Sequence, residues 1–271
     1  MGETVTKPKR PSNVEYAVCV HFDSASEMNY KVDRGRTVRT TARWEWWYQR
    51  AKIFESFVVP SLKAQNFQRF TLWGLFNKRD HARSESMRNL ICLAGGIVAL
   101  DGPRALREHY FNTCEWLCVI LLDSDDLYHP EAFADFAKQK PKSGHVCFFS
   151  RGWLYSLDDE KLHEFDPRGK GPGPWLARWY PNSALQSELD WWDYRKNHRF
   201  YLYHHQMRGR KENQELPGKR FMGLIHNENT ERAWNHKPTQ AKIGKRVTGE
   251  ERIAVLETFG IPLTQNWEVA R

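Results

Sequence analysis

Apolar and polar residues along the first half of the chain follow two spacings, one typical of strands and the other of helices. Short continuous apolar runs predict buried strands at residues 15–22, 70–76, 97–100 and 117–122. Between them, apolar residues at helical spacing predict helices at residues 44–65, 84–93 and 103–110. Strands that alternate with helices are joined by right-handed crossovers. The pattern therefore predicts an α/β fold with a mostly parallel sheet flanked by helices.

Proline and glycine mark several boundaries in this pattern. Pro60 lies inside the first predicted helix and must kink it or divide it in two. The segment at 165–175 contains GKGPGP, which is too rich in Gly and Pro for regular structure. It is either a mobile loop that closes over a ligand or an ordinary surface connection. Near the end of the chain, Thr248 and Glu251 form a capping box that predicts a last helix, which Gly260 ends.

The alternation of strands and helices is lost past residue 138, which suggests an organisation in two halves. Short strands are predicted at residues 146–149 and 153–157, where they could form a hairpin. A chain of 271 residues can bury one large core, with or without a small appended lobe. We therefore expect one globular unit with a disordered leader, an α/β half and a second half that ends in the C-terminal helix. The expected boundaries are residues 1–14, 15–140 and 141–271.

The charge of the chain points to a polyanionic partner. Its formal net charge is +8 and its isoelectric point is near 9.2. Nucleic acid, a nucleotide diphosphate and an anionic membrane surface all remain open as partners at this stage. No apolar run approaches the roughly 20 residues that cross a membrane. The first residues also lack the apolar core of a secretion signal, so we expect a cytoplasmic protein without a transmembrane segment.

The most informative stretch of the sequence is LDSDD, where the last of the four strands ends. The carboxylates of Asp123, Asp125 and Asp126 crowd the carboxyl end of this strand, where open α/β sheets bind ligands. Carboxylates this close repel one another unless a cation lies among them, and Mg²⁺ or Mn²⁺ takes such oxygen ligands. The alternative is an acidic turn that caps the helix expected from Pro130, but capping requires one Asp and not three.

Three segments give the chain a resemblance to a known class of enzymes. They are FVVPSLKAQNFQRF at 57–70, LDSDD at 122–126 and GLIHNEN at 223–229. Over roughly residues 15 to 230, the chain resembles the GT-A class of nucleotide-sugar glycosyltransferases, and more closely the rhamnosyltransferase family. The resemblance implies a GT-A-like (Rossmann-like) fold. Its first half would bind the nucleotide-sugar donor, and its C-terminal lobe would lie on the acceptor side.

The resemblance also implies a donor site with a divalent metal, Mn²⁺ or Mg²⁺, that bridges the donor diphosphate. The metal ligands would be Asp125 and Asp126 with help from Asp123, and His226 would be a late ligand to metal or phosphate. A histidine bonded within a turn is the alternative for His226. Further residues would contact the nucleotide: His21, Phe22 and Asp23 by lining its pocket, and Arg88 and Asp101 by reaching the diphosphate and the base or ribose.

An inverting transfer needs a general base beside the acceptor hydroxyl, whereas a retaining transfer does not. In proteins of the GT-A class an Asp or Glu at the start of a helix commonly has this role. The candidates here are Glu188, Asp190 and Asp193 in SELDWWD, with Asp190 slightly favoured. This segment departs from the usual Glu-Asp pair, so the resemblance does not identify the base.

The sequence leaves the acceptor and two other function classes open. The acceptor of a glycosyltransferase could be a polysaccharide, or a hydroxylated base in DNA, which the basic charge and many aromatic residues would suit. A second class is metal-dependent phosphoryl chemistry, either of a nucleotidyltransferase or of a nuclease-like protein, since His236 follows HNEN in a way that resembles His-Asn-His nucleases. A third class is a nucleic-acid-binding protein without catalytic activity.

Overall fold

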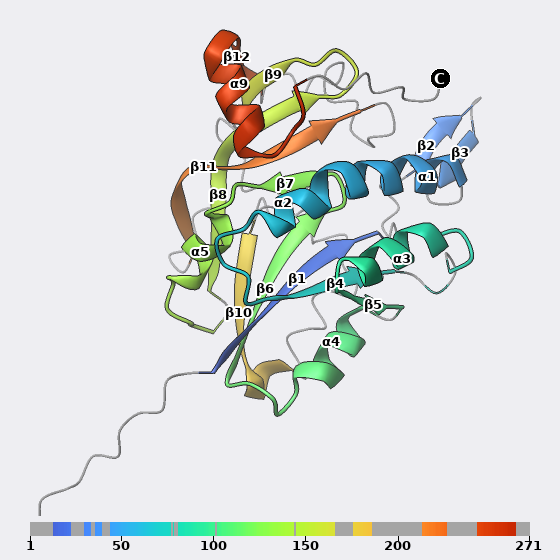
Figure 1. The fold of residues 1–271 in the computed structure, drawn as a ribbon. Helices are drawn as coiled ribbons and strands as arrows, with labels where there is room; N and C mark the ends of the chain where they lie inside the picture. The colour runs from blue at the N-terminus through green and yellow to red at the C-terminus, as the bar shows by residue number, and fades with distance from the viewer. Residues whose placement is uncertain are drawn as a thin grey trace, which may run out of the picture.

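A computed structural model places a single large sheet at the centre of the protein (Figure 1). It describes residues 13–22, 30–33, 36–39, 44–76, 78, 81–100, 102–143, 145–165, 176–185, 213–226 and 243–263. The large sheet has ten strands, and β11 and β7 attach to it outside the main order β12-β9-β8-β10-β6-β1-β4-β5. A separate two-stranded sheet is formed by β2 (Tyr30–Asp33) and β3 (Arg36–Arg39).

Four strands of the first half pair in parallel within the large sheet. They are β1 (Val14–His21), β4 (Thr71–Leu75), β5 (Ile97–Ala99) and β6 (Trp116–Asp123). In their register His21 lies opposite both Leu75 and Asp123, so the carboxyl ends of β1, β4 and β6 meet at one edge. The predicted α/β class, with a parallel central sheet flanked by helices, is confirmed.

The remaining strands form a mostly antiparallel extension of the sheet. Their bounds are β7 (Asp126–Tyr128), β8 (Val146–Ser156), β9 (Leu162–Phe165), β10 (Leu176–Pro181), β11 (Asn213–Ile225) and β12 (Ile243–Val247). β10 joins this extension to the parallel half by pairing antiparallel with both β6 and β8. β11 lies parallel to β8 and antiparallel to β7. The predicted hairpin at 146–157 is wrong, because β8 runs through it as one strand.

Gly152 explains how β8 continues where the sequence predicted a break. A Cβ at Gly152 would lie 2.5 Å from the carbonyl oxygen of Phe221 and 2.6 Å from its ring, so a larger residue could not lie beside β11 here. Arg151, its neighbour, is exposed. A glycine inside a strand often marks such a close approach of another backbone, and here it interrupts the apolar pattern but not the strand.

Helices cover both faces of the sheet. Their bounds are α1 (Trp44–Ile53), the π-helix η3 (Phe54–Val58), α2 (Val59–Lys63), α3 (Glu85–Leu93), α4 (Gly102–Tyr110), α5 (Ala132–Ala137), the 3-10 helix η5 (Asn182–Ala184) and α9 (Gly249–Thr258). One hydrophobic core includes residues of α1, α2, α3 and α5, and the other lies between the sheet and α4 (Figure 1).

The effect that Pro60 was predicted to have is visible in the α1–η3–α2 segment. The expected helix is divided by the π-helical turn η3, which ends immediately before α2 and its Pro60. A wider turn gives room to the proline ring, which otherwise clashes with the carbonyl four residues earlier. In α9, Gly260 ends the helix with a φ of +70°, as predicted. The predicted capping box is wrong, because Thr248 is the N-cap but its side chain makes no capping hydrogen bond in the described structure.

Candidate functional site

β11 brings a late part of the chain to the end of the acidic strand β6. β7 follows β6 after a short turn, and Gly223 of β11 pairs with Asp126 of β7. The backbone N–H of Leu224 donates to the carbonyl of Asp125 at 3.2 Å. β11 ends at Ile225, so the next residue, His226, lies beside Asp125, with 3.2 Å between Nε2 and Oδ2. Two residues that the resemblance assigned to one site are therefore in contact.

The third member of this site is Arg50, which the sequence analysis did not identify. Its guanidinium forms an ion pair with Asp125 through Nη1 and Oδ2, the same oxygen that His226 contacts. Only 5% of Arg50 is exposed. The guanidinium also lies over the ring of Trp46, 5.0 Å from its centroid, one helical turn earlier in α1. We refer to Arg50, Asp125 and His226 as the Asp125 site.

A signal for Arg50 was present in the sequence. Apart from Arg50, the buried residues of α1 are apolar: Trp46, Trp47, Ala51 and Ile53. An arginine in this helical pattern lies on the face that packs against the core. A guanidinium is always charged and is seldom buried without a carboxylate partner. The pattern therefore indicated a buried ion pair of Arg50, although it did not show which carboxylate is the partner.

Burial and charge act in opposite directions on Asp125. Burial alone would raise the pKa of its carboxyl, but the positive charge of Arg50 and the hydrogen bond from His226 outweigh it and hold the pKa well below the usual value. Burial lowers the pKa of His226, and Arg50 adds to this effect, while Asp125 opposes it. Because Asp125 is ionised and can only accept, Nε2 of His226 must carry the proton in their hydrogen bond.

The other two carboxylates of LDSDD lie near Tyr128. Asp126 is 7% exposed at the start of β7, and Asp123 is half-buried at the end of β6. Burial raises the pKa of Tyr128, and the charges of Asp126 and Asp123 raise it further. The Tyr128 hydroxyl therefore stays protonated, and it donates to the carbonyl of Leu121 at 2.7 Å.

These residues do not fit the divalent metal that the resemblance implies. Within the part of the chain that the structure describes, no three His, Cys, Asp or Glu side chains are grouped so as to hold a metal ion. The carboxylate that His226 contacts, Asp125, is already paired with the guanidinium of Arg50. The positive charge beside the acidic turn therefore comes from the chain itself, from the guanidinium of Arg50.

The remaining predicted site residues are partly described. Phe22 is 2% exposed and stacks on Phe76, with 4.7 Å between ring centroids, so it supports the end of β1 from within the core. Arg88 in α3 donates from Nη2 to the carbonyl of His81 at 3.0 Å. His21 is the last residue of β1, opposite Asp123. Five predicted site residues lie outside the described residues: Asp23, Asp101, Glu188, Asp190 and Asp193.

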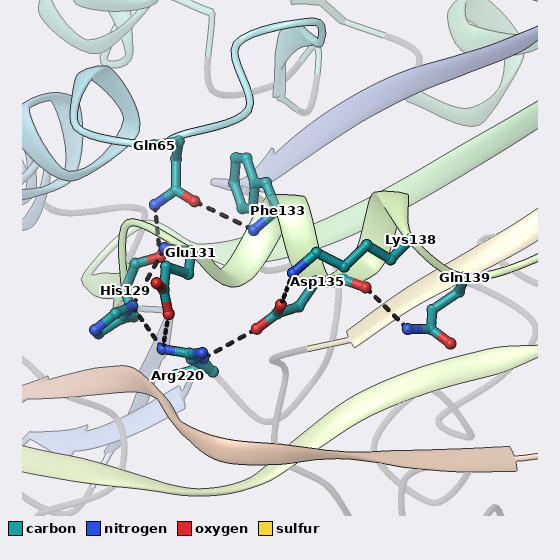
Figure 2. A network of polar contacts seen from close by, with 8 residues as sticks. All are labelled: Gln65, His129, Glu131, Phe133, Asp135, Lys138, Gln139 and Arg220. Carbon is teal, nitrogen blue, oxygen red and sulfur yellow. Dashed lines mark hydrogen bonds and ion pairs between the residues drawn. The ribbon is translucent and has the colours of Figure 1, made fainter.

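A buried polar network holds β7 in place from the side of α2. Gln65, which is 3% exposed, follows α2 and donates from Nε2 to the carbonyls of Tyr128 at 3.1 Å and His129 at 3.0 Å. Its Oε1 accepts from the backbone N–H of Phe133 at 3.3 Å (Figure 2). Ser61 adds a hydrogen bond to the carbonyl of Tyr128 at 3.0 Å. Side-chain to backbone hydrogen bonds therefore join the segment at 57–70 to the residues that directly follow LDSDD.

Arg220 joins β11 to the same region. It forms ion pairs with Glu131 and Asp135, and its Nη1 donates to Nδ1 of His129 at 3.1 Å (Figure 2). The three segments that carry the family resemblance thus meet around β7. This short strand in turn sets the position of Asp125.

Comparison with known proteins does not assign the chain to a family. No family model matches it, and no curated protein matches its sequence. Among solved structures, the inositol-1-phosphate CTP transferase from T. maritima is similar over 92% of this chain and 98% of its own, with 11% identity and a TM-score of 0.40. The glycosyltransferase GlyE of Streptococcus pneumoniae TIGR4 is similar over 92% of this chain, with 12% identity and a TM-score of 0.41.

S. aureus TarS 1-349 is a further similar structure, over 78% of this chain, with 14% identity and a TM-score of 0.34. The chain spans 61% of the GlyE structure and 60% of the TarS structure. At these identities and TM-scores the similarities assign no activity to the chain.

Proposed function

We propose that the protein is a glycosyltransferase that takes a sugar from a nucleoside diphosphate-sugar and passes it to an acceptor hydroxyl. The observation that carries the proposal is the Asp125 site, a buried guanidinium and an imidazole gathered at the carboxyl end of β6. Open α/β sheets bind ligands outside the carboxyl ends of their parallel strands. A guanidinium in that position suits the diphosphate of a nucleotide, because it recognises phosphate oxygens in a fixed geometry.

In the proposed reaction the bond between the anomeric carbon of the sugar and the diphosphate oxygen breaks, and the diphosphate leaves with the electron pair. The acceptor oxygen forms the new bond to the anomeric carbon and loses its proton. Negative charge grows on the leaving diphosphate, and Arg50 lies where it could stabilise that charge. The base for an inverting transfer remains proposed as Asp190, with Asp193 and Glu188 as the alternatives.

The donor is proposed from this geometry, whereas the acceptor is proposed from composition alone. A polysaccharide and a hydroxylated base in DNA are both compatible with the net charge of +8. Binding to DNA would weaken steeply with added salt, whereas binding to a neutral glycan would not. No helix in the described segments combines the length and the apolar character that crossing a membrane requires.

Thermal unfolding with nucleotides tests the proposal directly. UDP, dTDP, GDP and CMP would each be added with Mn²⁺ and, separately, with a chelator. A nucleotide at about a hundred times its dissociation constant adds about 2.7 kcal/mol to the free energy of unfolding. For a chain of this size that corresponds to a shift of several degrees, at roughly 2–4 °C per kcal/mol. Transfer or hydrolysis of the matching nucleotide-sugar would then be measured.

A shift with one nucleotide, lost in His226→Ala, is the expected result. No shift with any nucleotide under either condition would contradict the proposal. A salt-sensitive shift with DNA alone would favour the nucleic-acid-binding alternative, and metal-dependent cleavage of DNA would favour the nuclease-like one.

A further inference from the structure

Arg50 is buried among apolar side chains, and its burial has to be compensated. Its side chain is 6% exposed, and Trp47 and Ile53 are among the buried residues of the same helix. A guanidinium cannot lose its charge to avoid the cost of leaving water. It stays buried because Asp125, whose side chain is 16% exposed, provides the opposite charge. The guanidinium is therefore a fixed part of the Asp125 site and does not reach into it from the surface.

The position of Arg50 conflicts with a metal at the same carboxylate. The guanidinium and His226 both contact Oδ2 of Asp125, so a divalent ion bound there would lie against a permanent positive charge. Like charges at contact distance in a poorly hydrated site repel strongly. A metal could bind Asp125 only after Arg50 had moved out of the core, which would leave the guanidinium without its counter-charge.

Arg50 also retains an unused donor. Its Nε is buried, and among the described residues it has no hydrogen-bond partner. The same holds for Nε1 of Trp46, the ring over which the guanidinium lies. A buried N–H group without an acceptor is costly, and an anionic oxygen is the acceptor that a charged donor binds most strongly. Nε of Arg50 and Nε1 of Trp46, one turn apart in α1, are thus two buried donors that lack an acceptor among the described residues.

We infer that Arg50 is the resident cation of the Asp125 site and takes the place of a divalent metal. The inference rests on the proposed function: Arg50 would contact the diphosphate of the donor through Nε, while Nη1 stays on Asp125. A nucleoside diphosphate would then bind without metal. The acidic turn LDSDD acts in this arrangement as an anchor for the arginine, and Asp125 is a positioning residue.

Two measurements on the unmodified protein test the inference without any substitution. The first is binding of Mn²⁺ to the protein alone, followed by the electron paramagnetic resonance signal of free Mn²⁺. We expect no stoichiometric Mn²⁺ binding. The second is the affinity for the nucleoside diphosphate that gives the largest thermal shift, measured by calorimetry with a chelator and with Mn²⁺. We expect the two dissociation constants to agree within about twofold.

Substitution of Arg50 then tests whether Mn²⁺ can take the place of the guanidinium. Arg50→Gln removes the charge and frees Asp125 and His226, so we expect Mn²⁺ binding to appear in the variant. Its nucleotide affinity should fall at least tenfold with the chelator and recover in part with Mn²⁺. Adding Asp125→Asn to this variant should abolish the Mn²⁺ binding again. This double variant also removes the unpaired carboxylate, so the loss of nucleotide affinity can still be measured in it if Arg50→Gln alone fails to fold.

Arg69, an exposed arginine just before β4, provides a control near the start of β1. Its guanidinium lies 5.9 Å from the centroid of the Tyr16 ring and donates to the carbonyl of Val14 at 3.3 Å. Arg69→Gln removes a similar cation and ring contact near the start of β1. It should change neither Mn²⁺ binding nor nucleotide affinity.

The outcomes separate the inference from the proposed function. Stoichiometric Mn²⁺ binding to the unmodified protein that Asp125→Asn abolishes would overturn the inference, as would nucleotide binding that requires Mn²⁺. If no nucleotide binds under either condition, the proposed function fails. The Mn²⁺ measurements on the unmodified protein and on Arg50→Gln still decide which cation the Asp125 site holds.

Discussion

Nε2 of His226 lies 3.2 Å from Oδ2 of Asp125, although 101 residues separate the two in the chain. The contact follows from strand pairing, since β11 runs antiparallel to β7 and ends where the turn after β6 begins. Arg50 contacts the same carboxylate from α1, which comes before β6 in the sequence. Three distant parts of the chain therefore define one charged site, and substitutions in each of them have consequences that can be measured.

Breaking the ion pair should destabilise the protein strongly. Asp125→Asn leaves the buried guanidinium of Arg50 without a counter-charge, and breaking such a pair from one side costs about 3–5 kcal/mol. Denaturation in urea, followed by tryptophan fluorescence, would measure the loss. Combining Asp125→Asn with Arg50→Met should recover most of it, because both charges are then absent.

A surface pair provides the contrast for this prediction. Arg104 and Glu108 form an exposed ion pair on α4, with side chains 65% and 58% exposed. Arg104→Gln should leave the midpoint of unfolding unchanged, because exposed pairs contribute little. An equally small effect of Asp125→Asn would show that Arg50 is not buried as described.

Gln65 should contribute to stability through the backbone that it satisfies. Gln65→Ala removes the donor to the carbonyls of Tyr128 and His129 and the acceptor for the N–H of Phe133. Unsatisfied buried polar groups cost about 1–3 kcal/mol each, so we expect a loss of about 2–3 kcal/mol in the free energy of unfolding.

Gln139 is a suitable comparison for Gln65. Its Nε2 donates to a single carbonyl, that of Asp135, at 3.0 Å, in a half-buried position (Figure 2). Gln139→Ala should therefore cost clearly less than Gln65→Ala in the same urea titration. Equal losses would mean that the network around β7 has no special role.

Stability should fall in mildly acidic solution because of His129. Burial lowers the pKa of His129, and the charge of Arg220 lowers it further, against the opposing charges of Glu131 and Asp135. Nδ1 accepts hydrogen bonds from Arg220 and from the backbone N–H of Glu131 at 3.2 Å, so the folded protein holds the ring neutral.

The sign of this pH effect follows from proton linkage. The unfolded chain binds a proton at His129 near the ordinary pKa of about 6.5, whereas the folded chain binds it only at lower pH. The free energy of unfolding should therefore decrease as the pH falls below about 6.5, and level off once the pH passes the folded pKa. His129→Asn keeps an acceptor near Nδ1 and should reduce the slope measured by urea denaturation at several pH values. Part of the slope should remain, because burial also lowers the pKa of His145. An unchanged slope in His129→Asn would contradict the assignment.

Gly152 should tolerate no larger residue. An added Cβ would lie 2.5 Å from the carbonyl oxygen of Phe221, so Gly152→Ala forces β8 and β11 apart. Overpacking of this kind costs typically 1–3 kcal/mol. Because β11 also positions His226, nucleotide binding should weaken along with stability. Gly249→Ala, where no atom lies within 4 Å of the added Cβ but φ is +61°, should lower stability by about 1 kcal/mol without affecting binding.

The four parallel strands of the first half and the helices between them could be predicted because their signals are local. β6 and α4 each match the predicted ranges within one or two residues, since a buried strand or an amphipathic helix shows its own periodicity. That β8 is one continuous strand could not be predicted. Its glycine, Gly152, is required by the close approach of the Phe221 backbone, which belongs to another strand. Helical spacing places Ile253 on one apolar face of α9 with Leu256 and Phe259, but Ile253 is 41% exposed, whereas the other two are buried.

The candidate site was predictable only in part. The acidic end of β6 was evident from three carboxylates at the end of an apolar run, and His226 came from the family resemblance. Arg50 was missed because its partner depends on how α1 packs against the end of the sheet. The position of Arg50 on an apolar helix face was visible, but a periodicity argument does not show which charge meets it.

The pairing of β11 with β7 has a consequence for how the protein is made. While the chain emerges from the ribosome, Arg50 and Asp125 can meet early, but Arg220 and His226 are synthesised much later. Contacts between residues so far apart are slow to form, because a long loop must close before they gain any energy. The edge of β7 therefore stays unpaired in the nascent chain until β11 arrives, and until then this edge needs protection from aggregation.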